Sequence, residues 1–196
     1  MTFNNDKKLC LQKADKSKKG SIDKEIKPLI DIINSSPDYY TTSSCAGRIT
    51  LLELSKNGKK HEAKWLLISH NTVTMQQIKQ ALQQQYKKTV WLKEESSIIH
   101  INCRTIEDAT SLLHFFQENG FKRSGITSIK NKIMLEIMST ESMDVPVAEN
   151  NTQLIDDTYL KHCIALANQK LKTTKKRIKD ITKKLISFLA QPSLEL

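Results

Sequence analysis

One polar stretch, Tyr39-Tyr40-Thr41-Thr42-Ser43-Ser44-Cys45-Ala46-Gly47-Arg48, lies between a proline turn at Ser36-Pro37 and the apolar run Ile49-Thr50-Leu51-Leu52. Hydroxyls and the backbone N–H groups of a tight turn donate hydrogen bonds. Glycine lets a ligand approach the backbone, and arginine offers a planar fork for carboxylate or phosphate. This composition indicates an anion site. On spacing alone, however, the favoured interpretation is a plain loop whose side chains bond their own backbone.

The segment before this stretch predicts a helix that ends at Asn34-Ser35-Ser36-Pro37. Its apolar stripe repeats at three and four residues: Ile22, Ile26, Leu29, Ile30 and Ile33. Ser21 is a candidate cap, and Pro28 either kinks the helix or marks a start near Lys27. Residues 1–20 are lysine-rich and are expected to be a basic arm, either a frayed helix or mobile.

The segments after the stretch alternate between strand and helix patterns. Residues 49–54 and 62–69 flank Lys56-Asn57-Gly58-Lys59, a strong hairpin signal. Capping boxes at Thr74 with Gln77 and at Thr105 with Asp108 each start a helix. Further strands are expected at 89–93, 98–103, 126–129, 132–138 and 143–147, with Pro146 suited to a sheet edge.

This order predicts an α+β fold built from a duplicated strand and helix unit. We expect one mixed sheet with helices packed on it, followed by a long C-terminal helix. The expected boundaries are an arm at 1–20, a single domain at 21–190 and a tail at 191–196. A Rossmann-type sheet is disfavoured, because the chain has no GxGxxG motif and only five glycines.

The last helix is predicted from about Asp157, its candidate cap, to Phe188. Its apolar residues form a heptad seam: Leu160, Ile164, Ala167, Leu171, Ile178, Ile181, Leu185 and Phe188. We expect the seam to pack within the chain, with a dimer as the alternative. The other face carries nine cations against Asp180 alone: Lys161, Lys170, Lys172, Lys175, Lys176, Arg177, Lys179, Lys183 and Lys184. Such a run is usually a solvated face, but this excess also suits an RNA backbone.

Composition narrows the class of protein. The chain has 196 residues, of which 38% are hydrophobic and 27% are charged, and its net charge is +10, which favours polyanionic partners. No apolar run is long enough to span a membrane and no signal-peptide core is present, so we expect a cytoplasmic protein. Cys10, Cys45, Cys103 and Cys163 are widely spaced, which indicates neither a metal site nor a disulfide framework.

The opening stretch resembles the signature of the family of wybutosine-synthesising protein three, a group of tRNA methyltransferases. Other segments resemble the same family in the same order: Trp65 to His70, Ile101 to Arg104, Phe121 to Thr127, Asp144 to Pro146 and Ala167 to Lys170. The likeness covers about Lys24 to Phe188. The first motif is specific, and the others count as an ordered set.

The resemblance implies an enzyme that binds S-adenosylmethionine without a Rossmann sheet. The implied reaction is methylation of N4 of 7-(3-amino-3-carboxypropyl)-4-demethylwyosine beside the anticodon of phenylalanine tRNA. Such chemistry needs no metal; the protein aligns the reacting atoms and accepts a proton. We expect a monomer whose partner is tRNA. The alternative is a non-catalytic RNA-binding module.

The positions that match the family suggest roles for individual residues. Proposed catalytic residues are His70, Cys45 and Ser44. Proposed cofactor-binding residues are Ser43, Ser44, Gly47, Arg104, Ser124 and Gly125. Proposed substrate-binding residues are Arg48, Arg123, Asn168, Lys170, Lys175, Lys176 and Lys179. Taken singly, His70 suits a structural imidazole, Arg104 a surface ion pair and Cys45 a packed thiol; the functional roles depend on the loops forming one concave site.

Overall fold

The structure is a computed structural model that describes residues 2–12, 22–54 and 63–190. The expected cap at Ser21, the Asn57-Gly58 turn and the 191–196 tail lie outside the described residues. Contacts divide the chain into unit 1 (Met1–Ala46, Ser97–Thr140 and Lys175–Leu196) and unit 2 (Gly47–Ser96 and Glu141–Thr174). The expected domain boundaries stay a prediction.

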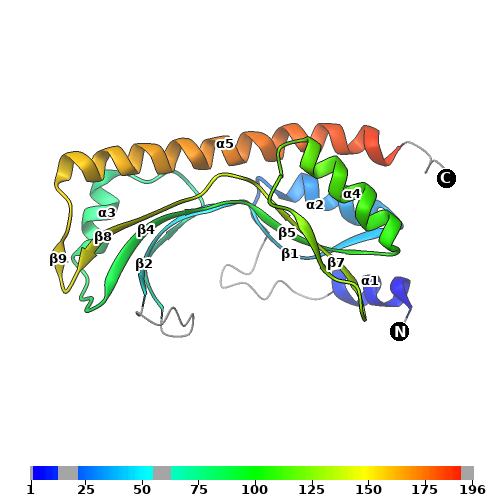
Figure 1. Cartoon of the computed structure of the whole chain (residues 1–196), viewed down its shortest axis with the longest axis horizontal. Helices are drawn as coiled ribbons and strands as arrows, with labels where there is room; N and C mark the ends of the chain where they lie inside the picture. The colour runs from blue at the N-terminus through cyan, green and yellow to red at the C-terminus, as the bar shows by residue number, and fades with distance from the viewer. Residues whose placement is uncertain (1, 13–21, 55–62, 191–196) are drawn as a thin grey trace. The chain divides into compact units, whose positions relative to one another are not determined.

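Unit 1 is built on a four-stranded antiparallel sheet with helices on both faces (Figure 1). In sheet order its strands are β1 (Tyr39–Cys45), β5 (Ile98–Cys103), β7 (Ile133–Met138) and β6 (Gly125–Ser128). Its own helices are α1 (Phe3–Leu11), α2 (Lys27–Ser35) and α4 (Ile106–Glu118).

The two faces of the unit 1 sheet differ because side chains alternate along each strand. Helices α2 and α4 cover the inner face, where Leu29 and Phe116 pack with Ile101 of β5. Helix α1 lies against the outer face, and its Phe3 ring contacts the ring of Tyr40 at 5.3 Å. Residues 3–11, expected as a frayed helix or a mobile arm, thus form a helix.

Unit 2 is built on a five-stranded antiparallel sheet. In sheet order its strands are β3 (Lys64–Ser69), β2 (Arg48–Leu54), β4 (Thr89–Glu95), β8 (Met143–Glu149) and β9 (Thr152–Gln153). Helix α3 (Met75–Leu82) starts at the expected capping box of Thr74 and Gln77, and Ile78 packs into a core with Ile49 and Leu92. The β2–β3 pairing confirms the predicted hairpin partners.

Helix α5 (Asp157–Leu189) contributes residues 157–174 to unit 2 and 175–189 to unit 1. Its seam is buried: Leu160, Ile164, Ala167 and Leu171 in the core of unit 2, and Ile178, Ile181 and Leu185 in that of unit 1. Packing within the chain is therefore confirmed. The cap is Asp156 rather than Asp157, because Asp156 Oδ1 accepts the N–H of Tyr159 at 2.8 Å.

The predicted α+β class with a long C-terminal helix is confirmed, but the single mixed sheet is wrong. Every strand pair among the described residues is antiparallel and the strands form two sheets. Strand β1 joins the first sheet beside β5, and β8 joins the second beside β4. These pairings are long-range, and local periodicity does not encode which distant strand becomes a neighbour. No helix among the described residues is long and apolar enough to cross a membrane.

Among the described glycines, Gly47, which precedes β2, is the one that the packing constrains most. Its φ is +91°, a left-handed conformation that favours glycine. A Cβ there would lie 3.1 Å from the backbone oxygen of Glu95 and 3.3 Å from Cγ2 of Thr174. Both the backbone angle and the close approach therefore require glycine in unit 2.

We expect Gly47→Ala to lower the free energy of unfolding by about 1–3 kcal/mol, because it adds backbone strain and a close contact with a backbone oxygen. Urea denaturation measures this change. Gly125→Ala is the matched control, since nothing lies within 4 Å of its Cβ position and its φ is not positive. A Gly47→Ala protein as stable as the Gly125→Ala control contradicts this account.

Candidate functional site

The stretch Thr41 to Cys45 forms most of strand β1, so the expectation of a loop is wrong here. A bulge between Thr41 and Ser43 shifts the alternation of the side chains between the two faces of the sheet. Ser44 pairs with Ile99 of the inner face, whereas Ser43 pairs with His100 and Cys45 with Ile98 on the outer face. The loop prediction failed because long-range pairing with β5 overrides the turn preference of serine and threonine.

A row of three polar residues and one glycine crosses the outer face of the unit 1 sheet. The register places Ser43 of β1 opposite His100 of β5, His100 opposite Glu136 of β7, and Glu136 opposite Gly125 of β6. We call these four residues the cross-strand row. It brings together two predicted site residues, Ser43 and Gly125, with two that the sequence did not single out.

Hydrogen bonds link three members of the cross-strand row. Ser43 Oγ lies 2.7 Å from His100 Nδ1, and His100 Nε2 lies 2.7 Å from Glu136 Oε2. Ser43 is exposed, and the side chains of His100 and Glu136 are 32% and 29% exposed. No atom lies within 4 Å of a Cβ built on Gly125. The row is therefore an ordered hydroxyl–imidazole–carboxylate arrangement that a ligand can reach.

The end of β1 is fixed by a residue that the sequence did not indicate. Asp23 is 6% exposed, and its Oδ2 accepts the backbone N–H of Ala46 at 3.0 Å. Cys45, one residue earlier, is half-buried. A buried carboxylate that accepts a backbone N–H holds the strand end in place, but the catalytic roles predicted for Cys45 and Ser44 stay predictions.

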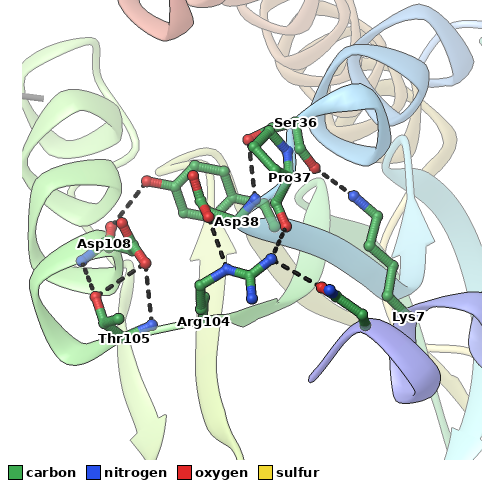
Figure 2. A network of polar contacts seen from close by, with 9 residues as sticks. Lys7, Ser36, Pro37, Asp38, Arg104, Thr105 and Asp108 are labelled. Carbon is green, nitrogen blue, oxygen red and sulfur yellow. Dashed lines mark hydrogen bonds and ion pairs between the residues drawn. The ribbon is translucent and has the colours of Figure 1, made fainter. Parts of the chain in front are cut away.

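Arg104 lies in a polar network at the start of β1 (Figure 2). Its Nε donates to Asp38 Oδ1 at 2.8 Å, and its Nη2 donates to Asn4 Oδ1 and to the carbonyl oxygen of Pro37, both at 2.9 Å. The guanidinium carbon also lies 4.6 Å from the ring centroid of Phe3. Arg104 thus binds α1 to the strand that follows α2, and its predicted contact with a cofactor stays a prediction.

Lys7 belongs to the same network and donates to the carbonyl oxygen of Ser36 (Figure 2). Burial lowers its pKa, and Arg104 lowers it further, while Asp38 opposes the shift. The charged side chains of Lys7 and Arg104 therefore hold the start of β1 in place through contacts with other residues of unit 1.

The segment before β6 includes two predicted residues, Ser124 and Arg123. Ser124 is nearly buried; its hydroxyl donates to the carbonyl oxygen of Phe121 at 2.6 Å and accepts the N–H of Met138 at 3.0 Å. Ser124 therefore shapes the turn that leads into Gly125, and cofactor contact through its hydroxyl stays a prediction. Arg123 is exposed beside this turn.

In unit 2, Arg48 is held in a defined position at the start of β2. Its Nε donates to Glu95 Oε2, and its guanidinium carbon lies 4.8 Å from the ring centroid of Trp65. The side chain is 32% exposed, and among the described residues its two terminal nitrogens have no hydrogen-bond partner. Arg48 therefore presents an oriented fork of the kind that binds carboxylates and phosphates.

His70 and Asn168 differ in how far the structure explains them. His70 directly follows β3 and is half-buried, and its catalytic role stays a prediction. The Asn168 amide is occupied by Val73: its Oδ1 accepts the Val73 N–H and its Nδ2 donates to the Val73 carbonyl, each at 2.8 Å. These bonds tie α5 to the segment before α3. They account for Asn168 without a substrate, so its substrate role stays a prediction.

Glu94 of β4 is a buried acid that the sequence analysis missed. It is 1% exposed, and among the described residues neither carboxylate oxygen has a hydrogen-bond partner. Burial raises its pKa to about 7; Lys170 opposes this, and Glu141 and Glu95 add to it. Lys170 itself donates to Glu141 at 3.2 Å, so this predicted substrate-binding lysine already has an anionic partner.

The basic face of α5 is less uniformly free than its sequence indicates. Lys175 pairs with Glu25, Arg177 donates to Thr140, and Lys184 donates to Asn119. Five exposed lysines remain without a partner among the described residues: Lys161, Lys172, Lys176, Lys179 and Lys183. At 100° per residue, the last three lie on one side of the helix, opposite the buried seam.

His100 and Glu136 had a weak signal in the sequence. Each is a polar residue that alternates with buried apolar ones in a predicted strand, a pattern that is typical of the face opposite the core. What the sequence lacked was the register that makes them neighbours of each other and of Ser43.

The chain is similar to known proteins along most of its length. The family model described as Methyltransferase TYW3 matches residues 5–187. A Pyrococcus abyssi protein named tRNA(Phe) 7-((3-amino-3-carboxypropyl)-4-demethylwyosine(37)-N(4))-methyltransferase 1 is 37% identical over 163 residues, which cover 83% of this chain and 84% of that protein. A Bos taurus tRNA wybutosine-synthesizing protein 3 homolog is 36% identical over 195 residues, which cover 93% and 75%.

Solved structures show the same fold. The structure of PH1069 protein from Pyrococcus horikoshii matches with a TM-score of 0.86 and 36% identity, covering 94% of this chain and 96% of that one. The crystal structure of a hypothetical protein from Aeropyrum pernix matches with a TM-score of 0.74 and 28% identity, covering 85% and 98%.

The raised pKa of Glu94 predicts a pH dependence of stability. Between its ordinary value near 4.5 and about 7, the folded state keeps a proton that the unfolded state has lost. The free energy of unfolding therefore falls as pH rises through this range and levels off above it. We expect Glu94→Gln to remove this fall and to be more stable than the wild type at pH 8 by about 2 kcal/mol.

Urea denaturation between pH 4.5 and 8 measures the effect. Glu118→Gln is the control, because Glu118 is an exposed acid on α4 and its replacement leaves the fall in place. If the wild type and Glu94→Gln proteins show the same pH profile, the buried acid is not the source.

Proposed function

Because the chain belongs to the TYW3 methyltransferase family, we propose that it transfers a methyl group from S-adenosylmethionine to N4 of 7-(3-amino-3-carboxypropyl)-4-demethylwyosine at position 37 of phenylalanine tRNA. The observation that carries the proposal is the match over residues 5–187, together with 37% identity to a protein of that name. The cytoplasmic location and the monomeric state stay predictions.

The described residues fit the cofactor in one respect on the unit 1 sheet. The cross-strand row offers acceptor oxygens on Ser43 and Glu136, and Gly125 leaves the backbone open beside them. Acceptors suit the ammonium and hydroxyl groups of S-adenosylmethionine, and an open glycine suits close approach. When bound, the cofactor supplies an electrophilic methyl group and a thioether leaving group.

The substrate carries a carboxylate on its aminocarboxypropyl side chain, and Arg48 fits that group. Glu95 and Trp65 hold the guanidinium in place, so less conformational entropy is lost when the terminal nitrogens bind an anion. Arg48 is therefore proposed as a substrate-binding residue.

The RNA backbone is proposed to contact α5. Lys176, Lys179 and Lys183 are exposed on one side of the helix, whereas Lys175 pairs with Glu25. Lysines without an internal partner are available to replace the counterions of phosphates. The same stripe would serve the alternative function, a non-catalytic RNA-binding module.

Labelled S-adenosylmethionine and tRNA from a strain blocked at the preceding methylation test the activity. We expect label in the nucleoside at position 37 with the wild-type protein. Arg48→Ala should reduce kcat/KM by about 100-fold or more, because the carboxylate loses its charge-assisted hydrogen bonds. Arg48→Lys keeps the charge without the fork and should recover only part of the activity.

Circular dichroism of both variants controls for folding. If tRNA binds equally well with and without the cofactor and no label is transferred, the module replaces the enzyme as the function.

Neutralising the exposed lysines tests the RNA surface. We expect the triple variant Lys176→Gln, Lys179→Gln and Lys183→Gln to reduce the slope of log Kd for tRNA against log salt concentration by about 2–3. Each lost phosphate contact accounts for about one unit of slope. Filter binding at about 50 to 300 mM salt, a range that includes physiological ionic strength, measures this slope.

The control removes the same charge elsewhere, with three scattered exposed lysines: Lys24, Lys87 and Lys130. An equal loss of slope in both triple variants shows a general charge effect, and an unchanged slope in the α5 variant removes this face from the interface.

A further inference from the structure

The two tryptophans of the chain lie in one line across the unit 2 sheet. The register places Leu52 of β2 between Trp65 of β3 and Trp91 of β4, and it places Pro146 of β8 beside Trp91. Residues directly opposite each other in an antiparallel pair point to the same face of the sheet. We call these four residues the tryptophan row.

The tryptophan row lies on the face of the sheet that the core of unit 2 does not use. Alternate residues of the same strands, such as Ile49, Leu51 and Leu92, form that core with side chains of α3 and α5. No member of the row belongs to it. Leu52 is 6% exposed with an indole on each side, whereas the two tryptophans are half-buried and Pro146 is exposed. Two large aromatic side chains are therefore partly open to solvent.

Polar groups on this face are also available to a ligand. Among the described residues, the indole N–H groups of Trp65 and Trp91 have no hydrogen-bond partner, although such groups are usually paired when buried. The Arg48 guanidinium lies over the Trp65 ring, 4.8 Å from its centroid, and adds a third planar group. The row thus combines flat apolar surfaces with hydrogen-bond donors and an oriented cation.

This combination suits the unpaired bases of single-stranded RNA. Bases that have left a helical stack lie on the faces of aromatic side chains and on the planes of guanidinium groups. The core of a protein–protein interface is instead depleted of charged residues. On this face the next row of residues carries an ion pair, because Lys93 and Asp144 pair at 2.5 Å two positions from Trp91 and Pro146. RNA is therefore the favoured occupant.

We infer that the tryptophan row binds the nucleotides next to position 37 of the tRNA, and that Trp91 stacks on one of their bases. This inference rests on the proposed function and deepens it, because Arg48 is proposed to hold the aminocarboxypropyl group of nucleotide 37 and lies against Trp65. Neighbouring nucleotides in the loop are joined to nucleotide 37 through single phosphates, so they lie near the same face. Arg48 occupies part of the Trp65 ring, which leaves Trp91 as the more open platform.

The tryptophan fluorescence of the full chain tests the inference, because the chain has no tryptophan outside the row. A base that stacks on an indole quenches its emission. We expect an unmodified RNA stem-loop with the anticodon sequence of phenylalanine tRNA to quench the wild type and Trp65→Phe, in which Trp91 is the remaining emitter. A fully paired RNA duplex of equal length should quench at least about threefold less, because its bases are stacked on each other.

Replacement of the Trp91 ring measures its share of the affinity. We expect Trp91→Ala to raise the Kd for the stem-loop by about 10-fold, and Trp91→Phe by no more than about threefold, because a phenyl ring still stacks. The slope of log Kd against log salt concentration should stay that of the wild type, since stacking releases no counterions. Circular dichroism checks the fold of both variants. If Trp91→Ala does not fold, the quenching of Trp65→Phe decides.

Tyr159→Ala is the matched control, because Tyr159 is an aromatic residue of unit 2 that is 50% exposed on α5, outside the row. It should keep the wild-type Kd. Absent quenching by the stem-loop, equal quenching by the duplex, or a folded Trp91→Ala protein with the wild-type Kd overturns the inference. Emission that changes with protein concentration before RNA is added also overturns it, since a second copy of the chain then covers the row.

Two outcomes separate this surface from methyl transfer itself. A protein that methylates nucleotide 37 without quenching by the stem-loop keeps the proposed function and loses the stacking surface. A protein that shows selective quenching but transfers no methyl group keeps the surface as an RNA-binding site, and the proposed function fails.

Discussion

The unit 1 site depends on the register between β1 and β5. With regular alternation after Thr41, which pairs with Ile101 of the inner face, Ser43 would also point into the core. The bulge at Thr42 inserts one residue and reverses the alternation. Ser43 then faces outward beside His100, while Ser44 turns inward opposite Ile99. One extra residue in a strand thus decides which hydroxyl can meet a ligand.

Around this register, the two faces of the unit 1 sheet have different tasks. The inner face is closed by α2 and α4 over an apolar core, which gives the strands their rigidity. On the outer face, α1 is fixed near the start of β1 by Arg104 and by the contact of Phe3 with Tyr40. The cross-strand row begins farther along β1, at Ser43, and stays exposed. Polar groups are therefore ordered on a rigid support without being buried.

Helix α5 has an apolar seam on one side and basic side chains on the other. The α5 seam is apolar except for Thr174, and its two parts fill the cores of the two units. Acidic residues from other segments neutralise some of the basic side chains, as Glu25 does for Lys175 and Glu141 for Lys170. A charge run in a sequence overstates the free positive charge, because ion pairs with distant residues remove part of it.

The sequence by itself determined the local elements: the capping boxes at Thr74 and Thr105, the helix that begins near Pro28, and the apolar seam of α5. These depend on residues within a few positions of each other, which periodicity and capping chemistry encode. Only the tertiary structure decided that Tyr39–Cys45 is a strand, that the strands form two sheets, and that His100 and Glu136 lie in line with Ser43. The reason is physical: strand register, bulges and the burial of ionisable groups such as Glu94 depend on residues from other segments, and no local pattern specifies them. His100 and Glu136, for example, lie 36 positions apart.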